Sequence, residues 1–456
     1  MGRTLGRYLS LEMVLLCLAE LLLSFVVIYA MLMSAPLSDL PSPGAAFRLS
    51  ARAEGANLAA VLAFTIGATS VMMGLYRPAV YLERRRLLLY VILAGVVAFP
   101  AILLVSQTLQ IRLSHYYLLW TLKVLLAWVG CLVLSRWIFA VAVRHRVFMR
   151  SVVVVGSGQR AERLAAMFSG QRGRLFELAG VFDAERFEDL PAMLRRRKIW
   201  AVVVASDALD QMTVERLMSC KLAGVQVFED GVFWEKHLGR LDLANTAPNW
   251  ILYAGGFASS RTSSAIRRVG DLALSLGVLI VTLPLMLLVA ALIKLDSSGP
   301  VFYGQKRVGL NGRVFTVFKF RSMRTDAEVG GQARWAVRND PRITRVGSVI
   351  RATRIDELPQ LLNVARGEMS FIGPRPERPE FVAELARAIP LYHDRAYVKP
   401  GITGWAQVNF PYGASVEDAR QKLSYDLFYV KNRSLLLDLL ILVSTIRVVL
   451  FQEGAR

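Results

Sequence analysis

Four long apolar runs follow one another in the first 150 residues of the chain. They cover about 11–33, 56–75, 87–109 and 116–140. Each run is close to the ~20 residues that a helix needs to cross the hydrocarbon core of a bilayer. Arginines gather before the first run, after the second and after the fourth, and cytoplasmic loops are enriched in Lys and Arg. We therefore expect four transmembrane helices within residues 1–145, with both ends of this unit in the cytoplasm.

Two charged residues, Glu20 and Lys123, lie inside these runs. Ionisable residues in a membrane are costly and are often functional, so a transport relay is one interpretation. We favour interhelical or interfacial pairing, which is the commoner role of such residues in a chain that also carries an enzyme.

The pattern changes after the fourth run to a buried-strand run, 151–155, that opens into a glycine turn and a helix. Helical stretches separate the further strands expected at 178–182, 199–205 and 225–228. This alternation predicts a Rossmann-like parallel-sheet domain over 150–245. The fingerprint G-x-G-x-x-A begins at Gly156, and Asp183 lies near the expected ribose position. Because a lone fingerprint is a weak signal, we favour a scaffold and expect no bound cofactor in this domain.

A linker in which Gly, Ser, Asn and Pro recur is expected at 246–265, before a further apolar segment at about 271–295. Pro284 interrupts this segment, and a proline removes a backbone hydrogen bond and kinks a helix. The roughly dozen residues before it would climb only ~20 Å as a helix, short of the ~30 Å hydrocarbon core. Hydropathy alone favours a tilted, kinked span, and a re-entrant hairpin is the alternative.

The composition also indicates a membrane protein. Of the 456 residues, 54% are hydrophobic, and the mean hydropathy is +0.42. The net charge of +20 suits nucleic acid, an anionic membrane surface or phosphorylated substrates, and the predicted spans favour the last two. The three cysteines form no CxxC motif and no Cys/His cluster, so we expect neither a disulfide framework nor a zinc site.

Residues 306–324 carry six basic side chains and no acidic one, with aromatic residues between them. Such interleaving occurs on nucleic-acid platforms, and a charge run is also common on a solvated, membrane-facing surface. Phe318 and Phe320 alternate with Lys319 and Arg321, which predicts a half-buried strand whose wet face holds two cations. Lys319 and Arg321 are therefore candidate ligands for a substrate phosphate.

Asp356 and Glu357 are adjacent carboxylates in the run T-R-I-D-E-L-P-Q-L-L-N-V. Pro359 is tolerated in the first turn of a helix, so a helix is expected to begin close to Asp356. The positive end of this helix, with Arg351 and Arg354, would keep both carboxylates ionised, which suits Asp356 as a nucleophile or metal ligand. Neighbouring helical residues point in different directions, so the two carboxylates cannot share one role. The alternative for the pair is a helix N-cap with a surface ion pair.

Two further motifs follow this pair. In G-P-R-P-E, residues 373–377, two prolines fix the backbone around Arg375, which suits a bidentate phosphate ligand and argues against the N-cap interpretation. The loop K-P-G-I-T-G-W-A-Q-V-N, residues 399–409, either closes over a nucleotide or rests at the lipid interface, and the sequence does not decide between them.

These motifs, in order over residues 297–409, resemble the catalytic signature of the bacterial sugar transferases. Those enzymes are monotopic phosphoglycosyltransferases, which move a sugar phosphate from a nucleotide sugar to a polyprenyl phosphate. The resemblance implies a mainly helical catalytic domain over 266–456, with a re-entrant membrane helix at about 271–295 that breaks at Pro284. The expected fold class is thus membrane α plus α/β, with the catalytic domain on the cytoplasmic face of the bacterial inner membrane.

The same resemblance implies a reaction. Asp356 would attack the β-phosphate of a UDP-hexose, with glucose or galactose expected, form a covalent phosphosugar and release UMP, and undecaprenyl phosphate would then take the sugar phosphate. Mg²⁺ is expected at Asp356, because a carboxylate approaches a diphosphate more easily when a cation neutralises it, and Glu357 would assist with the metal or with orientation. The implied substrate-binding residues are Lys319, Arg321, Arg354, Arg375 and Glu377. The product would begin an exopolysaccharide or capsule repeat, and we expect a homodimer that binds no nucleic acid.

Two other classes of protein remain open. A membrane-anchored nucleotide-sugar dehydratase also combines four spans with a Rossmann fold, but its Tyr-x-x-x-Lys or Ser-Met-x-x-Lys catalytic helix is not found in the right setting after Gly156. A polysaccharide-export protein or other transporter would explain the spans, but it would not explain the phosphate-binding motifs.

Overall fold

The computed structural model divides the chain into two compact units, Met1–Phe233 and Trp234–Arg456, and each is described by itself. The residues that the structure describes are 11–34, 45–73, 75–76, 90–92, 94–100, 102, 115–144, 149–170, 176–183, 199–205, 210–243, 261–325, 340, 342–410, 413 and 415–451.

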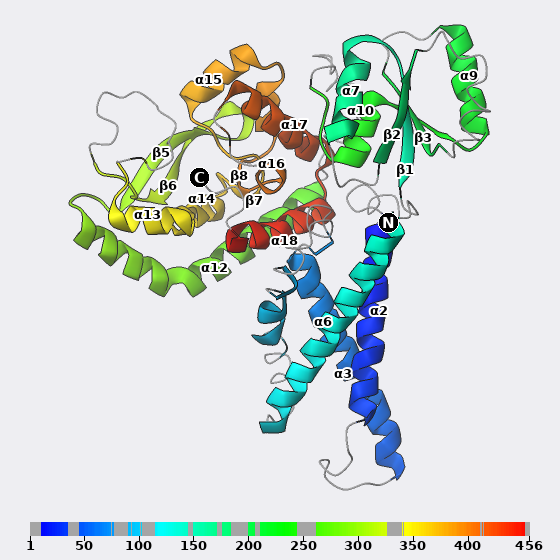
Figure 1. Cartoon of the computed structure of the whole chain (residues 1–456). Helices are drawn as coiled ribbons and strands as arrows, with labels where there is room; N and C mark the ends of the chain where they lie inside the picture. The colour runs from blue at the N-terminus through cyan, green and yellow to red at the C-terminus, as the bar shows by residue number, and fades with distance from the viewer. Residues whose placement is uncertain are drawn as a thin grey trace. The chain divides into compact units, whose positions relative to one another are not determined.

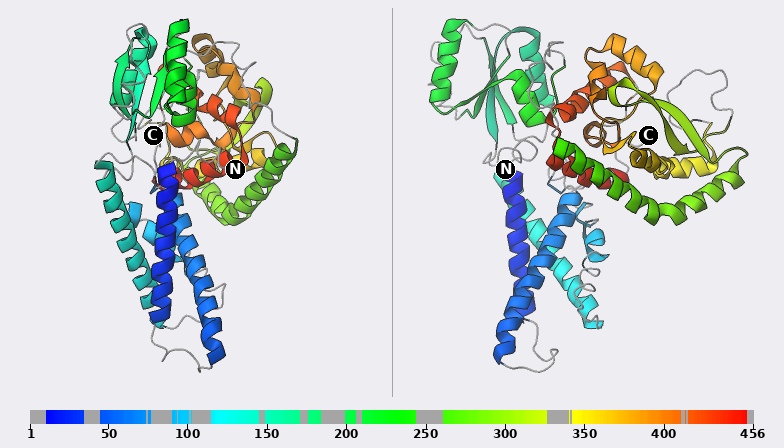
Figure 2. Two further views of the ribbon diagram at one scale, coloured as in Figure 1. Left: turned by 90° about the vertical axis from the view of Figure 1, so that its right-hand side faces the viewer. Right: turned by 180° about the vertical axis from the view of Figure 1, so that it is seen from behind.

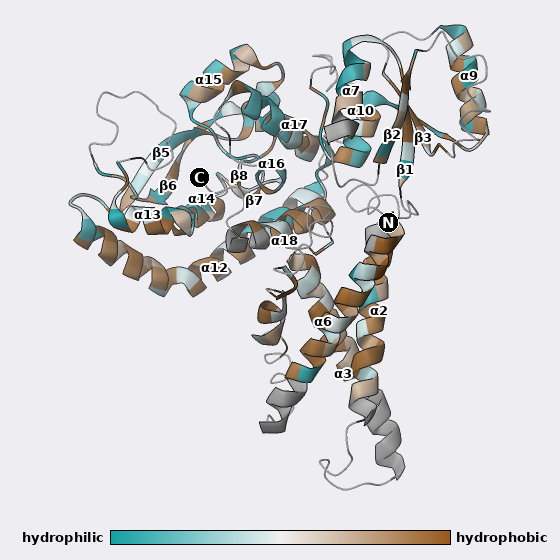
Figure 3. Cartoon of the chain, viewed as in Figure 1, coloured by the Kyte–Doolittle hydropathy of each residue, from teal (hydrophilic) through white to brown (hydrophobic). Residues whose placement is uncertain are grey.

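The first unit begins with three long apolar helices, α2 (Leu11–Ser34), α3 (Ala45–Met72) and α6 (His115–Arg144). Each contains an 18-residue stretch that is apolar enough to cross a membrane, as predicted for the first, second and fourth runs. Figure 3 shows the hydrophobic colouring that extends along these helices. About half of the predicted third span, 87–109, lies outside the described residues, and its described part, 90–92, 94–100 and 102, is helical. The chain is a membrane protein.

A buried ion pair joins two of these helices. Glu20 on α2 accepts from Arg136 Nη2 on α6 at 3.3 Å, and Ser135 and the Tyr76 hydroxyl donate to the same carboxylate at 2.6 and 2.7 Å. The interhelical pairing predicted for Glu20 is therefore confirmed. Its partner is Arg136, and Lys123 is exposed. Two oppositely charged side chains satisfy each other here where water is scarce.

The rest of the first unit is a parallel sheet with strand order β2-β1-β3-β4. The strands are β1 (Arg150–Val155), β2 (Phe176–Phe182), β3 (Ala201–Val204) and β4 (Gln226–Glu229). Helices α7 (Gly158–Gly170) and α9 (Gln211–Leu222) lie on opposite sides of the sheet (Figure 1). Because the sheet is covered on both faces, the central strands are runs of buried Val and Ala. The predicted parallel sheet and each of its four predicted strands are confirmed.

Packing within this sheet domain explains the first glycine of the fingerprint. Gly156 has φ +148°, and a Cβ atom there would clash with the backbone carbonyl of Ala205 at the end of β3. A close approach of backbones therefore requires glycine at residue 156 whether or not a ligand binds.

In the first turn of α7, Arg160 pairs with the buried carboxylate of Asp230 at 2.7 Å, at the start of the short helix α10 (Asp230–Phe233).

The second unit is built on α12 (Arg261–Asp296), the fourth apolar helix of membrane-spanning length. It begins within the predicted linker, of which residues 246–260 lie outside the described part of the chain. Figure 2 shows that α12 is bent, and Pro284 lies inside it. Apolar side chains on its outer face stay exposed, including Ile280 at 73% and Val281 at 80%. An exposed apolar surface of this length is typical of contact with lipid.

Short elements pack on one side of α12. They are the antiparallel hairpin β5 (Phe302–Val308) and β6 (Val314–Phe320) with η4 (Leu310–Gly312) between its strands, α13 (Arg345–Ala352), η5 (Ile355–Glu357), α14 (Gln360–Arg366), β7 (Ser370–Ile372), α15 (Pro379–Ala388), η6 (Tyr392–Tyr397), β8 (Gly401–Thr403), α16 (Trp405–Asn409), α17 (Val416–Asn432) and α18 (Leu435–Phe451). Strand β7 pairs in parallel with β8. Met286, Val289 and Ile293 of α12 form a core with Phe320 and Ile350. The expectation of a mainly helical domain is confirmed.

Both ends of α12 are tied to these elements by polar contacts. Near its start, Arg268 donates to the carbonyls of the last turn of α14 at 2.7 Å, and Asp271 accepts from the backbone N–H of Phe371 at 2.9 Å. At its far end, Asp296 accepts from the N–H of Val346 at 3.1 Å, and Arg321 donates to the carbonyls of the residues that follow the helix. One folded body therefore holds both ends of the helix.

Residues 234–243 also pack within the second unit, although they precede the predicted linker. Trp405 donates from Nε1 to the carbonyl of Gly239 at 2.7 Å, and Lys431 pairs with Glu235 of η3 (Trp234–Leu238) at 2.6 Å. The N–H of Leu241 donates to the carbonyl of Ser424 at 3.1 Å. This segment thus covers part of α16 and α17.

Candidate active site

Glu357 is the centre of a cluster of cations. Its carboxylate accepts from Lys319 Nζ at 3.1 Å and from Arg375 Nη2 at 2.7 Å, and Arg354 Nη1 lies 3.9 Å away. These cations come from β6, from the turn after β7 and from the residue before η5. The structure therefore brings together four of the residues that the sequence singled out.

The local fold around the dyad explains how the carboxylates are presented. Arg354 has the left-handed conformation, φ 57°, and turns the chain from α13 into the 3₁₀ turn η5 that holds Asp356 and Glu357. Pro359 then caps α14. A helix begins next to the dyad, as predicted. Positive φ in a residue with a side chain costs ~1–3 kcal/mol and occurs often at functional sites.

The two carboxylates have opposite electrostatic environments. Burial raises the pKa of Asp356, and the charge of Lys319 opposes this shift without cancelling it. Burial would also raise the pKa of Glu357, but the charges of Arg375 and Lys319 outweigh burial and hold that pKa well below its usual range. The prediction that basic neighbours favour both ionised forms is confirmed for Glu357 and wrong for Asp356. The reason is that the cations bind the glutamate directly, whereas desolvation dominates at the aspartate.

Arg321 lies apart from this cluster. Its buried guanidinium donates to the carbonyls of Ser298 and Ser297 at 2.6 and 2.7 Å, where α12 ends. Arg321 directly follows β6, so the alternation that places Lys319 on the wet face does not extend to it. The structure thus places Lys319 at the carboxylates and Arg321 against the backbone after α12.

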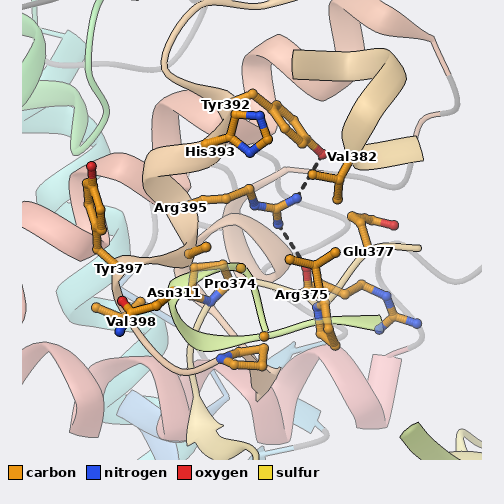
Figure 4. Close-up of a pocket in the computed structure, with 16 residues that line it drawn as sticks. Asn311, Pro374, Arg375, Glu377, Val382, Tyr392, His393, Arg395, Tyr397 and Val398 are labelled. Atoms are coloured by element: carbon orange, nitrogen blue, oxygen red, sulfur yellow. Dashed lines mark hydrogen bonds between the residues drawn. The ribbon is translucent and has the colours of Figure 1, made fainter. Parts of the chain in front are cut away.

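A hollow of about 430 Å³ adjoins the cluster (Figure 4). Its wall includes Arg375 and Glu377, and Glu377 lies 3.5 Å from the guanidinium of Arg307. The lining also includes Asn311 of η4 and, from η6, the side chains of Tyr392, His393, Arg395 and Tyr397. Arg375 is shared by the hollow and the Glu357 cluster, so a ligand that binds Arg375 can extend into the hollow.

Asp356 is the carboxylate of this site that suits a metal ion. Among the described residues it forms no ion pair, whereas the oxygens of Glu357 already face three cations. The described part of the chain contains no group of three or more His, Cys, Asp or Glu residues that could hold a metal. Mg²⁺ is commonly held by one or two carboxylates together with substrate phosphates and water, so a single carboxylate fits such a site.

Two supporting residues of the site, Asn363 and Arg395, were not predicted from the sequence. Asn363 is fully buried, accepts from the N–H of Phe318 at 3.1 Å and donates to the carbonyl of Thr316 at 2.7 Å, and so fixes the strand that carries Lys319. A polar residue on the apolar side of the short helix after the dyad was a usable signal for Asn363. Arg395, which donates to the carbonyl of Arg375 at 2.9 Å, lies in a run with no such signal.

The fold and the site define a membrane protein whose second unit presents two carboxylates and several cations, a combination suited to phosphorylated ligands. Residues 262–452 match the model of the family described as bacterial sugar transferase. The chain is 31% identical over 318 residues to the UDP-glucose:undecaprenyl-phosphate glucose-1-phosphate transferase of Escherichia coli (strain K12), which covers 66% of this chain and 68% of that protein. The chain belongs to the bacterial sugar transferase family.

Two other relatives are more similar in sequence. The chain is 45% identical over 240 residues to the UDP-N-acetylgalactosamine-undecaprenyl-phosphate N-acetylgalactosaminephosphotransferase of Aeromonas hydrophila, over 53% of this chain. It is 37% identical over 335 residues to the undecaprenyl-phosphate glucose phosphotransferase of Komagataeibacter xylinus, over 67% of this chain. The chain spans 56% and 60% of the lengths of these two relatives.

Proposed function

We propose that the protein transfers a sugar 1-phosphate from a UDP-sugar to undecaprenyl phosphate and releases UMP, as a first membrane step of exopolysaccharide or capsule synthesis. The observation that carries the proposal is the Asp356–Glu357 pair with Lys319, Arg354 and Arg375 gathered around it. Family membership and the names of the relatives support the same substrates. A cluster of cations beside a carboxylate that forms no ion pair with the described residues is suited to nucleophilic attack on a phosphate.

The different roles of Asp356 and Glu357 follow from their different electrostatic environments. An oxygen of Asp356 attacks the phosphorus that bears the sugar, the bond from this phosphorus to the bridging oxygen breaks, and UMP leaves with that oxygen. An oxygen of undecaprenyl phosphate then attacks the same phosphorus, which releases the Asp356 carboxylate and completes a ping-pong cycle. Glu357 holds Lys319 and Arg375 in place, where both contact the diphosphate. Mg²⁺ bound at Asp356 would neutralise phosphate charge.

The hollow gives the donor a place beyond its phosphates. Since Arg375 belongs to both the hollow and the cluster, we place the diphosphate at Arg375 and the adjoining part of the donor among Glu377, Asn311 and Tyr397. Arg321 acts in this proposal through the end of α12 and not as a direct phosphate ligand.

We also propose that α12 is re-entrant, entering the membrane and returning to the cytoplasmic face of the inner membrane. The contacts at its two ends support this arrangement, because a single folded body holds both Asp271 and Asp296. A helix that crossed the bilayer would separate these ends by the ~30 Å hydrocarbon core. The parallel sheet is then a Rossmann-like scaffold, and the first unit is a candidate surface for a homodimer.

The test measures UMP release by the purified protein in lipid, from a panel of UDP-sugars, with and without undecaprenyl phosphate. We expect UMP release with at least one sugar, and a labelled phosphosugar retained on the protein when the acceptor is omitted. Asp356→Asn should lower the rate by about 10³-fold or more, because it removes the nucleophile. Glu357→Gln should cause a large but incomplete loss.

Glu380→Gln is the matched control, because this exposed carboxylate on α15 lies outside the cluster and its loss should leave the rate unchanged. Near wild-type turnover of a folded, membrane-inserted Asp356→Asn variant would refute the nucleophile assignment. Absence of UMP release by the wild type with every donor would refute the proposed reaction.

A further inference from the structure

Arg375 contacts Glu357 and also lines the hollow. Its side chain is 32% exposed, so the position of its guanidinium depends on the backbone of residue 375. The turn around it is held on both flanks. The carbonyl of Pro374 accepts from the N–H of Gly401 at 3.0 Å, and the carbonyl of Glu377 accepts from the N–H of Val308 at 2.9 Å. Between these two anchors, the carbonyl of Arg375 itself accepts from Arg395 Nη2 at 2.9 Å.

We propose that Arg395, supported by Asp426, is a positioning residue for Arg375 in the transfer reaction. It fixes the carbonyl of residue 375, and thereby the direction in which the guanidinium of the same residue reaches Glu357 and a donor phosphate. This inference rests on the proposed function.

The guanidinium of Arg395 has its own fixed setting. Nη2 also donates to Asp426 Oδ2 on α17 at 2.7 Å, and Nη1 donates to the hydroxyl of Tyr392 at 2.8 Å. Only 12% of the Arg395 side chain and 4% of the Asp426 side chain are exposed. Dashed lines in Figure 4 mark hydrogen bonds of this group at the wall of the hollow.

The planar fork of arginine is needed for this arrangement. One guanidinium reaches a carboxylate, a phenol and a backbone carbonyl at once, and a lysine ammonium on a flexible stem cannot hold all three in the same geometry. The hydrogen bond to the Arg375 carbonyl is the contact that links Arg395 to the Glu357 cluster. A shift of ~1 Å in a catalytic group can cost about 100-fold in rate.

A double-mutant cycle tests the proposal. The variants are Arg395→Lys, Arg375→Ala and the pair, and kcat/KM is taken from single-turnover release of UMP with enzyme in excess. We expect Arg395→Lys to lower kcat/KM by about 10-fold to 100-fold, and Arg375→Ala by about 100-fold or more. Without the Arg375 side chain nothing is left to position, so the pair should stay within about threefold of Arg375→Ala alone.

Losses that multiply in the pair would overturn the inference, because they would show that Arg395 acts by another route. Thermal unfolding of each variant separates a folding defect from a positioning defect. If Arg395→Lys does not fold, Asp426→Asn replaces it in the cycle, since it removes the charged support at constant shape and should be non-additive with Arg375→Ala in the same way.

Glu417→Gln is the control on α17, the helix that carries Asp426. Glu417 forms an exposed pair with Arg420, and the loss of this pair should not change kcat/KM. The outcomes distinguish two failures. A wild type that releases no UMP refutes the proposed function, whereas an active wild type with an additive cycle refutes only the role of Arg395.

Discussion

Asp356 and Glu357 are neighbours in the sequence, yet the structure gives them different work. Glu357 pairs with Lys319, Arg354 and Arg375. These cations largely neutralise its negative charge, which makes it a weak nucleophile. Asp356 is equally enclosed, but the described residues give it no ion pair, and burial raises its pKa. An ionised carboxylate in such a site keeps its reactivity toward phosphorus. In the proposed reaction, Asp356 is therefore the nucleophile and Glu357 holds the cations in place.

Asp426 allows a prediction about pH. Burial raises the pKa of its carboxyl to about 6, although the charge of Arg395 opposes the shift. The unfolded chain has a pKa of ~3.9 at this residue, so the folded chain binds the proton more tightly. The resulting contribution to stability is complete below about pH 4 and is lost as the pH rises through about 6.

Asp426→Asn cannot titrate at this position. On going from about pH 8 to about pH 5, the wild type should gain about 1 kcal/mol in free energy of unfolding relative to Asp426→Asn. Unfolding in detergent at the two pH values measures this difference, and Glu417→Gln should show no such change. A constant difference between wild type and Asp426→Asn would mean that the carboxyl titrates normally.

Among single residues, those that lie in short sequence motifs could be predicted from the sequence. Lys319, Arg354 and Arg375 were predicted as site residues from local features, such as strand alternation and a proline-bounded turn. In the structure, all three lie at Glu357. The sequence misplaced Arg321, which lies one residue beyond the strand. Contacts between distant elements, such as Arg395 with Asp426, have no local signal, since only the packing of η6 on α17 brings them together.

Among the elements, α12 joins the site to the membrane. Its exposed apolar face contrasts with polar contacts at both ends, where Arg268 and Asp271 bind the body at one end and Asp296 binds it at the other. The buried strands of the parallel sheet were predictable because a short continuous run of β-branched apolar residues is typical of a strand that is buried on both faces. The start of α12 at Arg261 was not, because its first turns are polar and resemble a linker.

Cysteine labelling tests the path of α12. In a chain without its native cysteines, Ser298→Cys should resist a membrane-impermeant maleimide in intact spheroplasts and react after permeabilisation. Ser298 contributes its carbonyl to Arg321, so the substitution leaves that contact in place. Ser157→Cys, on the exposed turn before α7, should behave in the same way.

Ser38→Cys supplies the opposite control, because the arginine pattern places the loop between the first two spans outside. Labelling of Ser298→Cys in intact spheroplasts would establish a full crossing.

Pro284→Ala should restore a backbone hydrogen bond, straighten the helix and lower UMP release by moving the catalytic elements relative to the membrane.

For the molecule as a whole, the chemistry is concentrated in the second unit. The family match, 262–452, contains every residue proposed for the site. The boundary of the compact unit nevertheless lies earlier, at Trp234, because residues 234–243 cover Trp405 and pair with Lys431. Sequence composition marked the linker by its small and polar residues, but it carried no sign that the segment before the linker packs onto α16 and α17.

Two shortened chains separate these contributions, one beginning at Arg261 and one at Trp234. Both contain Asp356 and its cations together with α12, so both should release UMP in lipid at rates within about tenfold of the full chain if the first unit supplies no chemistry. The chain from Arg261 lacks the carbonyl of Gly239 and the carboxylate of Glu235, which leaves Trp405 Nε1 and Lys431 without these partners. The loss of each hydrogen bond costs about 1 kcal/mol, with more for the charged pair, so this chain should unfold several degrees below the chain from Trp234.

Thermal unfolding and UMP release, measured on the same preparations, decide between the possibilities. Equal melting temperatures would show that residues 234–243 contribute nothing to the fold of the second unit. Loss of turnover in a chain from Trp234 that is folded would show that the four-span unit or the parallel sheet supplies a required surface or ligand. Such a result would assign the first unit a part in the reaction, because every residue assigned to the chemistry is still present in that chain.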